Sequence, residues 1–296
     1  RLMLDKPVDS ALDAEDEMAL DIIVKHALNE AKKETNRSIK KFLKESNENF
    51  GNTNFLVVSS QMGKFESPIV NFDMDGVLVD FAGGVSNIAG SIVNMKNLLL
   101  PGEQQSTDLV TPGTFEDQNN PVATQQGALG VIGSKIFTKL VDAAGKFKHF
   151  ISSGKYKDAA YHEDYISNNA AFNTLIANLS KNPTFRQRFW QTLPPNSKGM
   201  QLYLDCLNVS NAKVGILTSP LLNRILDTVE GKKRWIATYM ATARPDFVIM
   251  DGNKQKYAIY NEQPTILIDD WDFNCEAFKQ AGGISIIFRE GVANIF

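Results

Sequence analysis

Short apolar segments alternate with amphipathic segments along the C-terminal third of the chain. The runs 214–217 and 266–268 hold only apolar residues and glycine, which is typical of strands buried on both faces of a sheet. Between such runs, apolar side chains recur with the spacing of a helix. This alternation predicts an α/β fold in which a Rossmann-like parallel sheet is covered by helices on both faces. Strands are expected at 69–72, 213–219, 246–250, 265–270 and 284–288, and helices at 200–207, 232–241 and 273–281.

A block of different character follows the first strand. Residues 84–195 interrupt the α/β pattern, and we expect them to form a helical cap domain inserted into the core, which then comprises 67–83 and 196–296. Within the block, residues 101–129 are rich in Gln, Asn, Thr, Gly and Pro, a composition that predicts a long loop or flap. Helices are expected at 81–100, 131–147 and 159–179.

Residues 1–66 are expected to form an N-terminal helical extension. Asn36 and Arg37 followed by Ser38 suggest that a second helix begins there, which would make a helical hairpin. The apolar stripe predicts packing on the main body of the protein, or docking of a partner or a second copy of the chain. The stripe consists of Leu20, Ile23, Val24, Ala27, Ala31, Ile39, Phe42 and Leu43.

Composition excludes some classes of protein. The 296 residues carry a net charge of −3, which argues against broad electrostatic binding to nucleic acid or to an anionic membrane. No apolar run approaches the ~20 residues that a membrane span needs, and no secretory signal is expected. Cys206 and Cys275 lie in apolar segments that we expect to be buried, so a reducing compartment, the cytoplasm, is expected.

Polar side chains follow three of the predicted strands at the point where each strand ends. Because the carboxyl ends of parallel strands share one edge of a sheet, we expect these side chains to converge. Clustered carboxylates repel one another, and a hard cation such as Mg²⁺ relieves that repulsion while it binds a phosphate substrate. The residues are Asp73 and Asp75, Thr218 and Ser219, and Asp269 and Asp270.

Such a cluster can carry out phosphoryl transfer. One carboxylate of the first pair can attack phosphorus and form an aspartyl-phosphate. The second carboxylate can protonate the leaving oxygen and then activate water. A hydroxyl group of the second strand can hydrogen-bond the transferred phosphoryl oxygens, and a lysine is needed to neutralise their charge.

The residues at these strand ends resemble the motifs of the haloacid dehalogenase superfamily. Within it, the chain is similar to the 5'(3')-deoxyribonucleotidase family over residues 68–83 and about 185–288. The resemblance leaves out the N-terminal extension and fades in the middle of the cap. It rests on Asp73-Met74-Asp75-Gly76-Val77-Leu78-x-Asp80-Phe81, Phe189-Trp190-x-x-Leu193-Pro194, Ile216-Leu217-Thr218-Ser219-Pro220, Lys232-x-x-Trp235 and Leu267-Ile268-Asp269-Asp270.

The resemblance implies a role for each acid. Asp73 would be the nucleophile and Asp75 the general acid and base. Mg²⁺ would be held by the carboxylates of Asp73 and Asp269 and by the backbone carbonyl of Asp75. Asp270 would be a neighbouring acid outside this set of ligands.

The resemblance also implies how the substrate is bound. Thr218 and Ser219 would bind the phosphate. Lys232 would neutralise it, with Lys233, Lys254 and Lys256 as rivals for that role. Phe81 would line a nucleoside pocket. The alternative is that Phe81 simply packs in the hydrophobic core.

Two departures from the family pattern bear on the substrate. Family members often carry Arg after the last acid pair, where this chain has Trp271, and the predicted cap is longer than usual. The favoured expectation is a Mg²⁺-dependent phosphatase that hydrolyses nucleoside monophosphates, with deoxynucleotides preferred. The alternatives are a phosphatase for another small phosphate ester and an assembly protein that uses this fold as a scaffold. The base, the sugar and the phosphate position stay open at this stage.

Overall fold

The computed structural model describes residues 12–46, 67–99, 131, 134–153, 169–220 and 227–289. The predicted loop 101–129 lies outside the described residues. The first part of the predicted helix 159–179, residues 159–168, also lies outside them, and so do the side chains of Ile39, Phe42 and Leu43. Among the described residues, no helix combines the length and apolar character that crossing a membrane requires.

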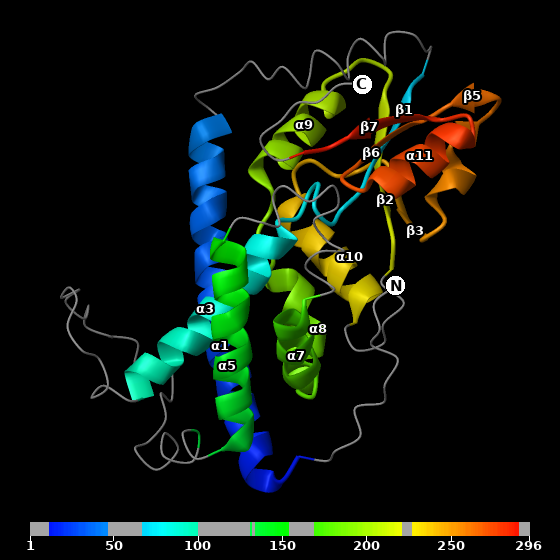
Figure 1. Cartoon of the computed structure of the whole chain (residues 1–296). Coiled ribbons are helices and arrows are strands. Elements are labelled where there is room, and N and C mark those ends of the chain that lie inside the picture. Colours follow the sequence, from blue (N-terminus) through cyan, green and yellow to red (C-terminus); the bar gives the residue numbers. More distant parts are fainter. Residues whose placement is uncertain are drawn as a thin grey trace.

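The predicted parallel sheet is confirmed. Its five strands are all parallel and lie in the order β3-β2-β1-β6-β7, so that β1 is central (Figure 1). Phe72 at the end of β1 pairs with Ile216 of β2 on one side and with Ile268 of β6 on the other. The three strands therefore end at one edge. The strands are β1 (Ile69–Phe72), β2 (Lys213–Thr218), β3 (Val248–Met250), β6 (Ile266–Asp269) and β7 (Ile284–Ile287).

Helices cover the sheet, as the alternating pattern predicts. Helix α9 (Ser197–Leu207) packs on β2, and α11 (Asp272–Gln280) packs on β6 and β7. Helix α10 (Thr228–Tyr239) contacts the short elements α8 (Pro183–Arg188) and η2 (Phe189–Thr192). The α/β class is thus confirmed, and the arrangement is compatible with a Rossmann-like fold.

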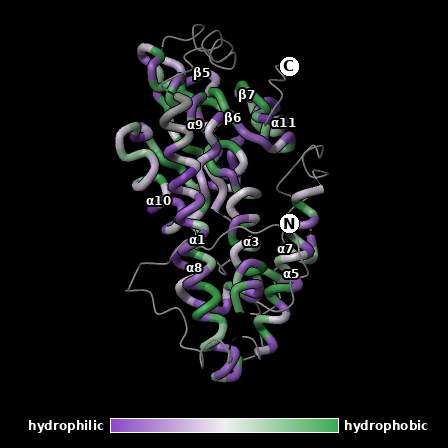
Figure 2. The backbone as a smooth tube through the Cα atoms, turned by 90° about the vertical axis from the view of Figure 1, so that its left-hand side faces the viewer, coloured by the Kyte–Doolittle hydropathy of each residue, from purple (hydrophilic) through white to green (hydrophobic). Residues whose placement is uncertain are grey.

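A group of helices lies at one end of the sheet. Helices α3 (Phe81–Leu99), α5 (Lys135–Ser152) and α7 (Ala170–Leu179) pack side by side in that order (Figure 1). In Figure 2, green hydrophobic and purple hydrophilic stretches alternate in the part of the molecule that holds these helices. One continuous hydrophobic core joins these helices to the sheet. The division of the chain into cap and core at the predicted boundaries stays a prediction.

The N-terminal segment corrects one expectation. Residues Ala14–Ser46 form a single helix, α1, and the predicted hairpin with a second helix from Ser38 is wrong. The Ser38 hydroxyl donates to the carbonyl of Glu34, one turn earlier, and so it does not cap a new helix. Helix α1 packs on α3 and α5, and the described part of its apolar stripe is covered within the chain. The covered residues are Leu20, Ile23, Val24, Ala27 and Ala31.

Helix α1 is also tied to the rest of the protein by polar contacts. The Thr35 hydroxyl donates to the carbonyl of Thr192 at 2.7 Å, and Asp16 accepts from the backbone N–H of Ile136 at 3.0 Å. These buried and part-buried hydrogen bonds fix the helix against η2 and against the start of α5. The packing interpretation of the stripe is therefore supported.

Two small elements between β3 and β6 were not predicted. Lys254–Tyr257 form the 3₁₀ turn η3, and a two-stranded hairpin follows, with β4 (Ile259–Tyr260) and β5 (Gln263–Pro264). The hairpin turns through Asn261 and Glu262, which both have positive φ. Strands of two residues are too short to show an alternating pattern.

Candidate functional site

The chain turns sharply where β1 ends. The backbone N–H of Asp73 still donates to the carbonyl of Ile268 on β6, at 2.8 Å. Gly76 then adopts φ +72°, a conformation that favours glycine. A Cβ at this position would lie only 2.1 Å from Oδ2 of Asp270. Glycine is therefore required here both by the backbone and by the close approach of the Asp270 carboxylate.

Three buried carboxylates meet beside this turn. Asp73, Asp269 and Asp270 each offer an oxygen, and these oxygens lie within 4.8 Å of one another. Burial raises the pKa of Asp269, the nearby charge of Asp73 raises it further, and Lys254 opposes the shift. Oxygen ligands in a small buried cluster fit a hard divalent cation, so the triad could hold a metal ion.

The triad differs from the predicted ligand set. Asp73 and Asp269 are brought together, as predicted, but the third carboxylate in reach is that of Asp270, which was placed outside the ligands. The carboxylate of Asp75 instead forms an ion pair with Lys232. The predicted metal ligand was the backbone carbonyl of Asp75, and the ion pair involves only the side chain. The predicted role of that carbonyl is therefore untested.

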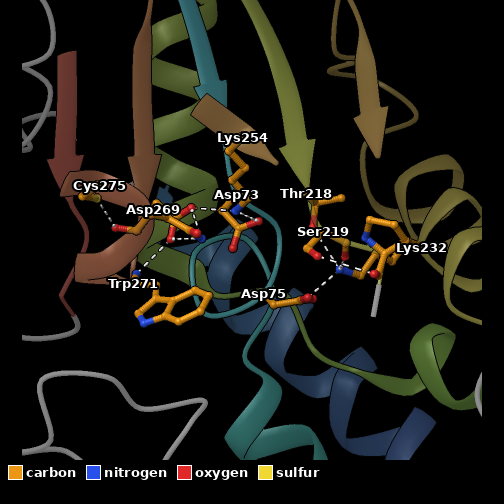
Figure 3. A network of polar contacts seen from close by, with 11 residues as sticks. Asp73, Asp75, Thr218, Ser219, Lys232, Lys254, Asp269, Trp271 and Cys275 are labelled. Atoms are coloured by element: carbon orange, nitrogen blue, oxygen red, sulfur yellow. Dashed lines mark hydrogen bonds and ion pairs between the residues drawn. The ribbon is translucent and has the colours of Figure 1, made fainter. Parts of the chain in front are cut away.

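Lys254 supplies a counter-charge to the triad. Its Nζ lies 2.7 Å from Oδ1 of Asp73 and 2.6 Å from Oδ2 of Asp269 (Figure 3). Burial alone would lower the pKa of this ammonium group, but the two carboxylates outweigh burial and raise it. Lys254 is therefore charged at neutral pH and can interact favourably with a bound anion.

Further donors hold Asp269 in place. The backbone N–H of Trp271 donates to Oδ1 of Asp269 at 2.9 Å, and the Asn274 amide lies 3.1 Å from Oδ2. Sequence reasoning missed Asn274. Its one signal is its position in the first turn of the helix that follows the acid pair.

Lys232 organises the other half of the site. It is fully buried, forms an ion pair with Asp75, and donates to Thr218 Oγ1 at 2.9 Å and to the Ser219 carbonyl at 3.0 Å. Its ammonium group also lies 4.7 Å from the centre of the Trp190 ring, a cation–π contact that the sequence did not reveal. Lys232 thus links the ends of β1 and β2.

Asp75 is buried beside this lysine. Burial raises the pKa of its carboxyl group, and the charge of Asp73 adds to the shift, whereas Lys232 opposes it. Within the described part of the chain, Oδ1 of Asp75 has no hydrogen-bond partner. A buried carboxyl group with one free oxygen and a raised pKa is suited to exchanging a proton with a ligand.

The remaining predicted residues fall into two groups. Lys233 is exposed, and Lys256 forms an ion pair with Asp251 at 3.3 Å, so neither rival lysine joins the cluster around the acids. Phe81 is half-buried, and its ring centre lies 6.0 Å from those of Phe172, Phe189 and Trp190. This packing fits a core phenylalanine, and its place in a nucleoside pocket stays a prediction.

No protein-family model matches this chain, and none of the curated proteins compared with it matches either. The chemistry of the site therefore has to be argued from its own geometry. That geometry brings together four buried carboxylates, two buried ammonium groups and one threonine hydroxyl near the ends of three adjacent strands.

Proposed function

We propose that this protein is a metal-dependent phosphomonoesterase that hydrolyses nucleoside monophosphates, with deoxynucleotides as the preferred class. One observation carries the proposal: a buried carboxylate triad lies beside two buried lysines at the ends of β1, β2 and β6. The carboxylates suit a divalent cation, and the lysines suit the negative charge of a phosphate. The choice of a nucleotide rests on the resemblance of the strand-end motifs.

In the proposed reaction, Asp73 is the nucleophile. One of its carboxylate oxygens attacks phosphorus, the ester P–O bond breaks, and the leaving oxygen takes a proton from Asp75. The products of this step are a free nucleoside and a phosphoryl group on Asp73. The raised pKa of Asp75 supports its role, because the group must carry a proton when the leaving oxygen departs.

The second step returns the enzyme to its starting state. Asp75, now ionised, takes a proton from water, and the water oxygen attacks phosphorus. The bond between phosphorus and Asp73 then breaks, and phosphate is released. In both steps Lys254 would offset the charge around Asp73, and Lys232 with Thr218 would orient Asp75 and the phosphoryl oxygens.

Asp73, Asp269 and Asp270 would hold Mg²⁺, whose charge would offset that of the phosphoryl oxygens when it is bound. Lys254 would also orient the nucleophile, because its ammonium group contacts the carboxylates of both Asp73 and Asp269.

Phosphate release from a panel of monophosphates tests the proposal. The wild type should hydrolyse deoxynucleoside monophosphates with Mg²⁺ and not with EDTA. Asp73→Asn should lower kcat by at least about a thousandfold, since it removes the nucleophile. Asp142→Asn changes an exposed acid on α5 and serves as the matched control.

The panel also separates the alternatives. Full activity of Asp73→Asn would refute the nucleophile. Faster hydrolysis of a sugar phosphate or another small ester than of any nucleotide would keep the chemistry and replace the substrate class.

A further inference from the structure

Trp271 differs from the other two tryptophans of the chain. Trp190 and Trp235 are fully buried, whereas Trp271 is half-buried at the point where β6 passes into α11. Its backbone N–H donates to Asp269 Oδ1 at 2.9 Å, so the residue is fixed directly to the carboxylate triad. The backbone of Trp271 is thus held beside the candidate reaction centre, and its side chain is only partly buried.

A second aromatic ring lies against Trp271 on the outer side. The ring centres of Trp271 and Phe273 are 5.3 Å apart with planes inclined by 35°, and Phe273 is 67% exposed. Apolar side chains that are exposed together, and not singly, can mark a ligand-binding surface. The two rings form one continuous apolar surface, called the Trp271–Phe273 shelf below.

The indole projects towards the site. In Figure 3 the indole lies below the end of β6, on the side of the strand ends where the Asp73 carboxylate lies, whereas the Asp75 carboxylate points away from it towards Lys232. A phosphate bound at the triad would carry its leaving group past this ring. An indole face offers no charge to a phosphate or a sugar, but it stacks well on a planar ring.

We propose that the Trp271–Phe273 shelf stacks on a planar aromatic ring of the leaving group and selects for phosphate monoesters that carry one. This inference rests on the proposed phosphatase function and deepens it, because it assigns recognition of the substrate's aromatic ring to two residues at the start of α11. A heteroaromatic base attached through a sugar is the class of leaving group that fits, since the sugar separates the ring from the phosphate.

Two substrates with the same leaving oxygen test the shelf. Thymidine 5'-monophosphate and 2-deoxyribose 5-phosphate share the primary 5-hydroxyl leaving group and differ in the base. Stacking of a base on an aromatic side chain is strong enough that Trp271→Leu should lower the ratio of their kcat/KM values about tenfold. The loss should appear in KM for the nucleotide, because stacking is the same in the ground and transition states.

Matched variants identify the cause. Trp271→Phe keeps a ring and should keep most of the ratio, which separates stacking from a general loss of structure. Tyr260→Leu removes an aromatic side chain that is 54% exposed on the β4–β5 hairpin and should leave the ratio unchanged. Titration calorimetry of both esters into the Asp73→Asn protein, with and without Trp271→Leu, measures binding without turnover.

The outcomes separate the two proposals. Equal efficiency of the wild type on both esters, or an unchanged ratio in Trp271→Leu, would overturn the shelf and leave the phosphatase standing. If no ester is hydrolysed, the proposed function fails, and calorimetry decides the shelf. Tighter binding of the nucleotide that is lost in Trp271→Leu would then support it, and equal binding of the two esters would overturn it.

Discussion

The ammonium group of Lys254 lies 2.6 Å from Oδ2 of Asp269, and both side chains are buried. The lysine comes from the 3₁₀ turn η3 and the aspartate from the end of β6, so the contact joins two segments that are 15 residues apart. The same ammonium group reaches Asp73 on the central strand. Lys254 therefore balances two of the three clustered carboxylates when no cation accompanies them.

Removing this lysine should destabilise the metal-free protein. Lys254→Met leaves two buried carboxylates without their counter-charge, and the loss of one partner of a buried pair typically costs about 3–5 kcal/mol. Urea unfolding in EDTA should show this loss, and Mg²⁺ should restore part of it, because the cation can replace the missing charge. An unchanged free energy of unfolding in EDTA would contradict the role assigned to Lys254.

Lys232→Met is the matched comparison for that experiment. Lys232 is equally buried, but its partner is the Asp75 carboxylate, which lies outside the triad. Its loss should therefore destabilise the protein without recovery in Mg²⁺. Equal recovery of both variants would mean that the cation does not bind where the triad lies.

Magnesium binding should depend on Asp270. A cation that binds only the folded state at a hundred times its Kd adds about 2.7 kcal/mol of stability, which raises Tm. This rise in Tm should shrink in Asp269→Asn and in Asp270→Asn, whose carboxylates belong to the triad. It should persist in Asp75→Asn, which keeps the backbone carbonyl. A full rise in Asp270→Asn would return that residue to the outer position that the resemblance gives it.

Gly76→Ala should damage both stability and metal binding. The new methyl group would lie 2.1 Å from Asp270 Oδ2, and the backbone has φ +72°, so strain of about 1–3 kcal/mol is expected. Displacement of Asp270 should also weaken Mg²⁺ binding, measured by calorimetry. Gly90→Ala is the control, since a Cβ there meets nothing within 4 Å in the middle of α3. That change should stabilise the helix by about 0.5–1 kcal/mol.

His26 should make stability depend on pH in the acid range. Burial lowers the pKa of this imidazole in the folded protein below its usual 6.5, with Lys33 acting in the same direction and Glu30 opposing it. The unfolded chain therefore takes up the proton first as the pH falls. Stability should decrease as the pH falls through 6.5 towards the lower folded value.

Urea unfolding between pH 7.5 and pH 5 tests this dependence. His26→Gln should reduce the loss of stability over that range, whereas His149→Gln, at an exposed position of α5, should not. A slope that is identical in wild type and His26→Gln would show that other groups govern the acid response.

The local pattern was sufficient for the central strands. The segments 69–72, 213–219, 265–270 and 284–288 are mainly apolar, and each contains an observed strand of the sheet. Short, mainly apolar segments of this kind, alternating with amphipathic helical segments, are typical of strands in a sheet covered on both faces. The convergence of Asp73 and Asp269 then follows, because parallel strands present their carboxyl ends at one edge.

The helix α1 shows where local signals failed. Asn36, Arg37 and Ser38 have side chains that often begin or end a helix, yet the helix continues through them. Packing of α1 against α3 and α5 stabilises one continuous helix more than a helix cap at Ser38 would stabilise two shorter ones. Local preference is a weak term beside the burial of the apolar face that the described part of α1 packs against the rest of the protein.

The sequence by itself determined the strands of the parallel sheet and the acids that meet at their ends, because both follow from the apolar pattern and from the geometry of a parallel sheet. Only the tertiary structure decided which of four lysines contact the acids, that the Asp270 carboxylate joins those of Asp73 and Asp269, and that Trp271 lies beside them. These contacts depend on the directions of side chains that are set by the 3₁₀ turn η3, by the start of α11 and by the turn at Gly76. Such directions are set by packing between distant segments, and no local pattern of residues records them.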